Sequence, residues 1–82
     1  MNIKLINEVS WGGNPLAPLV HMVLSEMKIK HNLELIETDK ALKKFGIKNT
    51  PAMIIDKKVV IEGTIPSMLV IKDIIKDNLT LD

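Results

Sequence analysis

The 82-residue sequence contains no cysteine and no arginine, and Trp11 and Phe45 are its only aromatic residues. Without cysteine the chain forms no disulfide and supplies no thiolate, so it cannot carry out dithiol–disulfide exchange by itself. All 11 basic residues are lysines and the net charge is +1. No guanidinium group is therefore available for bidentate contacts to guanine or phosphate, and nucleic acid is not an expected partner.

Long apolar runs are also missing. The longest one, around Leu16–Leu24, is interrupted by Pro18 and His21 and is too short to cross a bilayer. The opening residues Met1–Lys4 lead into a strand pattern and not into the apolar block of a signal peptide. The apolar fraction of 46% is ample for an aliphatic core. We therefore expect a cytoplasmic protein with no membrane partner, folded as a single domain over residues 1–82.

Apolar periodicity and turn residues predict an α/β chain with the order β-α-β-α-β-β-α. The predicted elements are a strand over Ile3–Val9, a helix over Leu16–Met27, a strand over Leu33–Ile36, a helix over Lys40–Phe45, a hairpin of Met53–Ile55 and Val59–Ile61, and a helix from a Ser67 cap to about Leu79. Helical connections indicate parallel pairing among the early strands, and the hairpin adds an antiparallel edge.

The stretch Gly46–Asp56 is the part of the sequence around which the predicted elements are arranged. Gly46 suits the left-handed residue that ends a helix, and Pro51 lacks the N–H that a strand interior needs. The apolar run Ala52–Ile55 is typical of a central strand covered on both faces. A Thr50–Pro51 bond in this position is a candidate for a cis peptide, although an ordinary trans proline at a strand entrance fits the same pattern.

This order, with Thr50-Pro51 before the third strand, resembles the thioredoxin fold, and most closely the very small thioredoxin- and glutaredoxin-like proteins. The resemblance covers nearly the whole chain and implies a three-layer fold around a four-stranded mixed sheet. In the family a Cys-x-x-Cys motif begins the first helix. Counting from the first strand, and counting back from Leu16-Ala17-Pro18, both place Ser10-Trp11-Gly12-Gly13 at that motif. Both sulfur atoms are therefore replaced.

The resemblance implies a binding face beside the proline, uncharged and with Lys48 at its rim. Its residues would be Ser10, Trp11, Gly12, Gly13, Asn49, Thr50, Pro51, Thr64 and Ile65. With no catalytic residue assigned, we expect a redox-inactive pseudo-redoxin that binds a protein or peptide partner. Two alternatives stay open: a protein that binds glutathione or a similar small thiol, which then supplies the sulfur, and a structural dimerisation domain. A monomer and a homodimer both fit.

The individual residues of the motif also have purely structural interpretations. Ser10 lies, by the resemblance, at a helix N-terminus, where it would favour an anion or serve as the N-cap. Trp11 would be either an exposed anchor for a partner or a ring folded over the helix start. Gly12 and Gly13 would permit a close backbone approach or form a turn.

Metal and cofactor sites are not expected. His21 and His31 fall on different predicted elements, and no third ligand follows at metal-binding spacing. The carboxylates are scattered among lysines, as on solvated faces, and no pair is placed for acid–base chemistry.

Overall fold

The computed structural model describes residues 1–7, 13–37 and 43–79. Its elements are β1 (Asn2–Asn7), α1 (Ala17–Met27), β2 (Asn32–Glu37), β3 (Ala52–Ile55), β4 (Lys58–Glu62) and α3 (Met68–Asp77), and residues 43–45 are helical as well. The predicted order of strands and helices is confirmed. The predicted strand end at Val9 and the predicted start of the second helix lie outside the described residues.

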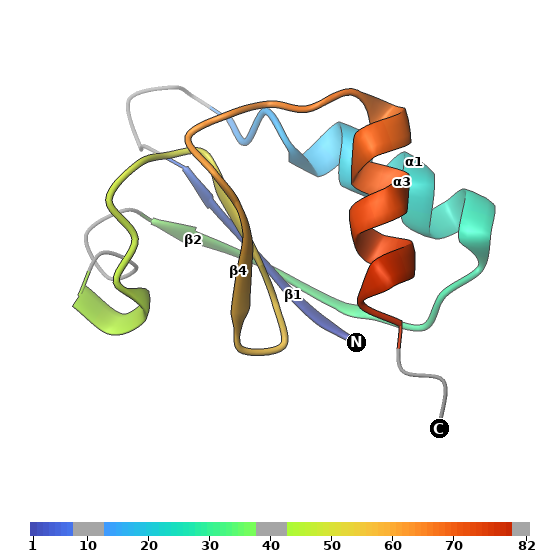
Figure 1. Cartoon of the computed structure of the whole chain (residues 1–82), viewed down its shortest axis with the longest axis horizontal. Helices are drawn as coiled ribbons and strands as arrows, with labels where there is room; N and C mark the ends of the chain where they lie inside the picture. The colour runs from blue at the N-terminus through green and yellow to red at the C-terminus, as the bar shows by residue number, and fades with distance from the viewer. Residues whose placement is uncertain (8–12, 38–42, 80–82) are drawn as a thin grey trace.

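The four strands form one mixed sheet in the order β2-β1-β3-β4 (Figure 1). β1 and β2 pair in parallel, and β3 pairs antiparallel with both β1 and β4. Parallel pairing is thus confined to β1 and β2, and the predicted mixed sheet with an antiparallel hairpin is confirmed. The reason lies in the connection: the chain leaves β2 and enters β3 at the same end of the sheet, since Ala52 lies opposite Ile6 near the end of β1. β3 must then run back along the sheet.

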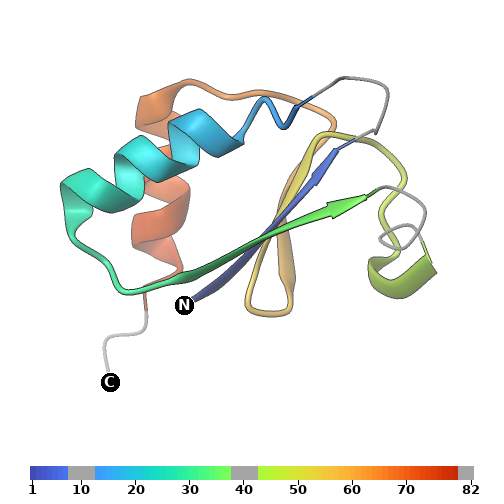
Figure 2. The same ribbon diagram turned by 180° about the vertical axis from the view of Figure 1, so that it is seen from behind.

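One face of the sheet is covered by α1 and α3, which lie on the same side of it in both views (Figures 1 and 2). Alternate residues of β1 and β3 point to these helices, as the period of two requires. The buried cluster on this side consists of Ile3, Leu5, Leu16, Val20, Val23, Leu24, Met53, Ile55, Ile61, Ile71 and Ile75. This aliphatic cluster is the main core, and it holds α1 and α3 against the sheet.

The intervening residues of the same strands face the other side, where Phe45 and Ile47 pack against the sheet. The buried cluster here is smaller and consists of Ile6, Ile47, Ala52 and Ile54, with Ile36 and Phe45 packed against it. The sheet thus lies between two layers, and all four residues of β3 are buried, as expected for a central strand.

The ends of the helices are set by their flanking residues. Gly46 has φ +66, the left-handed conformation that the sequence predicts after residues 43–45. The Ser67 hydroxyl accepts a hydrogen bond from the Val70 N–H at 3.3 Å, so Ser67 is the N-cap of α3, as predicted. Among the helices that the structure describes, none has the length and apolar character needed to cross a bilayer.

The start of α1 differs from what the resemblance implies. Leu16, and not Ser10, occupies the N-cap position of this helix. The turn before it is made by Asn14, whose side-chain oxygen accepts from the Leu16 N–H at 3.0 Å and whose carbonyl accepts from the Ala17 N–H at 3.2 Å. Pro15 and Pro18 have no N–H to donate, but they lie at the helix start, where the first N–H groups have no partner within the helix in any case. The Val20 N–H, just after them, donates to the Leu16 carbonyl at 2.9 Å. The placement of Ser10 itself lies outside the described residues.

Candidate functional site

Three chain segments meet where β1 ends, β3 begins and β4 ends. The register places Ala52 opposite Ile6 on one side and opposite Glu62 on the other. The described segments that adjoin the ends of β3 and β4, residues 48–51 and 63–65, therefore lie together at one end of the sheet, and both ribbon views show them there (Figures 1 and 2). We call this site the Pro51 edge, and its described residues are Gly13, Lys48, Asn49, Thr50, Pro51, Glu62, Gly63, Thr64 and Ile65.

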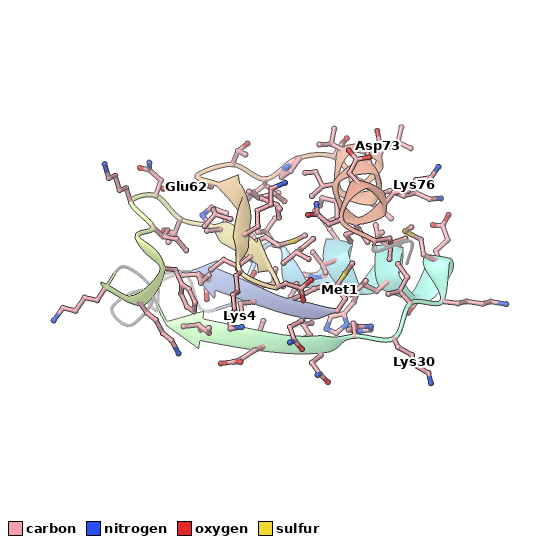
Figure 3. The ribbon with its side chains drawn as sticks, turned by 60° about the horizontal axis from the view of Figure 1, so that its bottom comes forward. Met1, Lys4, Lys30, Glu62, Asp73 and Lys76 are labelled. Atoms are coloured by element: carbon pink, nitrogen blue, oxygen red, sulfur yellow. The ribbon has the colours of Figure 1, made fainter. Side chains whose placement is uncertain are left out.

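The loop before Pro51 is held by the side chain of Glu62. A single carboxylate oxygen, Oε2, accepts hydrogen bonds from the main-chain N–H of Lys48 at 2.8 Å and of Asn49 at 3.1 Å. Hydrogen bonds to a charged acceptor are shorter and stronger than those between neutral groups. The last residue of β4 (labelled in Figure 3) therefore fixes the path by which the chain enters β3.

Gly63 ties the same two segments together at close range. Its N–H donates to the Pro51 carbonyl at 2.8 Å, and its φ of +77 lies in the left-handed region that favours glycine. A Cβ atom at this position would lie 2.9 Å from Cβ of Asn49, too close for an unstrained contact. Glycine is thus required at position 63 for two reasons: the left-handed backbone conformation and the close approach of the loop before Pro51.

The third segment is anchored by a pair of asparagines. The Asn7 side-chain amide, at the end of β1, donates to the Gly13 carbonyl at 2.7 Å, and Asn14 Nδ2 donates to Asn7 Oδ1 at 3.5 Å. Gly13 is exposed, and a Cβ atom there would meet nothing within 4 Å. Its carbonyl is fixed at the sheet end while the space around its Cα stays open to a ligand.

The sequence-predicted site residues that the structure describes lie together at this edge. Pro51 is buried and joined to Thr50 by a cis peptide, whereas Thr64 and Ile65 are exposed, Ile65 by 52%. Gly13 and Asn49 reach the edge through the hydrogen bonds given above. Ser10, Trp11 and Gly12 lie outside the described residues.

The expectation of an uncharged face was wrong in one respect. The Glu62 carboxylate lies among the expected residues, although its Oε2 is engaged by two N–H groups. Lys48 is exposed beside it, in agreement with its predicted place at the rim.

Sequence reasoning missed the three residues that organise the site: Asn7, Asn14 and Glu62. Asn14 carried a usable signal, because an Asn-Pro pair at a helix start is typical of a side-chain turn. Glu62 carried no such signal in the sequence, because a glutamate at the end of a hairpin strand is usually an ordinary solvent-exposed charge. Among the described residues, no group of three His, Cys, Asp or Glu side chains is placed to hold a metal ion.

The sheet order, the two covering layers and a Thr-Pro peptide at the entrance of β3 together define a thioredoxin-like domain. Comparison with family models agrees: the model described as "Thioredoxin domain" matches residues 1–76, and the chain belongs to this family. The family predicted from the sequence is thereby confirmed. No curated protein and no solved structure matches the chain.

Proposed function

We propose that this cysteine-free thioredoxin-like domain binds an extended peptide segment of a partner protein at the Pro51 edge, without catalysing a reaction. The observation that carries the proposal is that the edge is held together by contacts that involve no sulfur. Asn7 anchors Gly13, Glu62 anchors the loop before Pro51, and Gly63 joins that loop to β4. A site held in one conformation before binding loses less entropy when a ligand arrives.

The exposed groups at the edge favour a peptide as the ligand. Ile65 offers an apolar side chain, and the open space at Gly13 allows another backbone to approach closely. Extended peptides are commonly recognised through main-chain pairing, with pockets for alternate side chains. The chain has no cysteine with which to attack a bound disulfide, so binding need not lead to chemistry.

The test begins with a random linear heptapeptide library displayed on phage and selected on the immobilised full chain. A selected peptide is then synthesised and titrated into the ¹⁵N-labelled protein. We expect saturable amide shifts at Gly13, Asn49, Thr64 and Ile65. Failure to enrich any peptide over bare support, or shifts confined to another face, would reject the proposal.

Two matched substitutions locate the contact. Ile65→Thr and Val59→Thr each replace an exposed β-branched apolar residue by a polar one, but Val59 lies near the hairpin turn, away from the Pro51 edge. If the peptide contacts the Ile65 side chain, Ile65→Thr should weaken peptide binding about fivefold, as expected for a moderate interface contact. Val59→Thr should leave peptide binding unchanged. Equal effects of the two changes would contradict the assignment.

The same assays separate the alternatives. Saturable shifts at Gly13 with reduced glutathione, and none with a selected peptide, would favour a thiol-binding role. A molar mass that rises with protein concentration, with neither ligand bound, would favour a structural dimerisation domain.

A further inference from the structure

A hollow lies on the sheet face opposite α1 and α3, toward the end of the sheet remote from the Pro51 edge. It has a volume of about 560 Å³ and is lined by Asn2, Lys4, Lys44, Phe45, Asp56 and Lys57. These residues come from β1, from the helical residues 43–45 and from the turn between β3 and β4. Three separate parts of the chain therefore contribute to its wall, and its volume suits a small ligand.

Positive charge predominates in this hollow. Three of its six lining residues are lysines, and its one carboxylate, Asp56, accepts a hydrogen bond from the Asn2 N–H at 3.1 Å. Within residues 1–7, 13–37 and 43–79 the single ion pair joins Lys72 to Glu26, on α3 and α1. Glu34, the register partner of Lys4 on β2, forms no ion pair with it. None of the lysines of the hollow therefore forms an ion pair with a described carboxylate, and the lysines outnumber the one carboxylate of its lining by three to one.

Two of these lysines converge on the same aromatic ring. Lys4 Nζ lies 5.8 Å and Lys44 Nζ lies 5.5 Å from the centroid of Phe45. Each contact is within the range of a cation–π interaction. Figure 3 shows Lys4 projecting from β1 away from α3. Because Lys4 is only partly exposed and Phe45 packs against the sheet, these two residues form the fixed wall of the hollow.

We propose that this hollow binds a small phosphate-bearing ligand, either inorganic phosphate or a phosphate ester. A compact dianion can accept hydrogen bonds from more than one ammonium group at once, and the hollow offers three. Lysine binds phosphate as a point charge and needs no guanidinium fork. The Phe45 ring would provide an apolar wall for the organic part of an ester. This site is independent of peptide binding at the Pro51 edge.

The proposal is tested by titrating sodium phosphate into the ¹⁵N-labelled full chain, with ionic strength held constant by sodium chloride. We expect saturable shifts at Lys4, Phe45 and Lys57, with a dissociation constant in the millimolar range, and no shifts at Gly13 or Gly63. A parallel titration with glycerol 3-phosphate distinguishes the sources: tighter binding of the ester would indicate that the organic part contacts Phe45.

Matched lysine variants decide whether the hollow is responsible. Lys44→Gln removes an exposed charge at the hollow, and Lys76→Gln removes an exposed charge on α3. We expect Lys44→Gln to weaken phosphate binding about three- to fivefold, as for one exposed charge contact, and Lys76→Gln to leave it unchanged. Lys4→Gln should weaken binding further. A response that stays linear with phosphate, or equal effects of Lys44→Gln and Lys76→Gln, would overturn the proposal.

Discussion

Replacement of Gly63 by alanine tests whether the Pro51 edge depends on the close approach of β4 to the loop before Pro51. Alanine at φ +77 costs roughly 1–2 kcal/mol for its left-handed conformation. Its Cβ would also lie 2.9 Å from Cβ of Asn49, whose N–H is held by Glu62. Moving this loop weakens a hydrogen bond to a charged acceptor, which is worth about 1.5–3 kcal/mol when intact and less here because the contact is exposed. We therefore expect a total loss of about 2–4 kcal/mol.

Gly46 provides the matched control for this substitution. It has φ +66, yet a Cβ atom there meets nothing within 4 Å. Gly46→Ala should therefore cost only the conformational term, roughly 1–2 kcal/mol, and the effect of alanine on the unfolded chain is the same in both variants. Urea unfolding followed by circular dichroism measures the difference, and Asn49→Gly should partly restore the Gly63→Ala variant. Equal losses for Gly63→Ala and Gly46→Ala would refute the close contact.

Three further substitutions test other parts of the structure. Glu62→Gln keeps an acceptor but removes its charge, so we expect a loss of about 1 kcal/mol and faster hydrogen exchange at the Lys48 and Asn49 amides; unchanged exchange would contradict the role of the carboxylate. Ile71→Ala should cost about 2–5 kcal/mol because Ile71 is fully buried. Leu69→Ala, at a residue that is 76% exposed, should stay within about 0.5 kcal/mol in the same urea experiment.

Local signals in the sequence predicted most of the fold. The period of two in the first predicted strand and the helical spacing in Leu16–Met27 reflect which side chains are buried in the core. Because burial of these side chains stabilises the strand and the helix, the spacing predicted both elements. Gly46 and Ser67 act on their immediate neighbours, so their roles as helix terminator and N-cap followed from the sequence alone. The family resemblance added the three-layer arrangement and the assembly of the four predicted strands into one mixed sheet, which periodicity alone did not fix.

Contacts between distant segments could not be predicted in this way. Glu62 accepts hydrogen bonds from residues 13 and 14 positions earlier, and Lys4 and Phe45 meet across the sheet face. Neither contact can be recognised from the local sequence pattern, because each of these side chains, taken alone, is compatible with a position on the solvent-exposed surface. The direction of β3 could not be predicted for a related reason: it depends on the end of the sheet at which the chain enters this strand, and periodicity carries no information about that end.

Cysteines introduced at positions 10 and 13 test whether the Pro51 edge corresponds to the redox edge of the family. The family resemblance assigns the two cysteine positions to Ser10 and Gly13, and a Cβ atom at Gly13 would meet nothing within 4 Å. We therefore expect Ser10→Cys/Gly13→Cys to fold and to form an intramolecular disulfide on air oxidation. Mass spectrometry would detect it as the loss of two hydrogen atoms, reversed by dithiothreitol.

Gly13→Cys alone is the control for this variant, because it can form only intermolecular disulfides. In a dithiothreitol-driven insulin reduction assay the natural chain should give no increase over the uncatalysed rate, since it has no attacking thiolate. The double variant should accelerate the reaction, because its two thiols would supply both attack and resolution beside Pro51. A folded double variant whose cysteines stay reduced, or pair only between molecules, would show that the register taken from the family is shifted and that Ser10 does not belong to this edge.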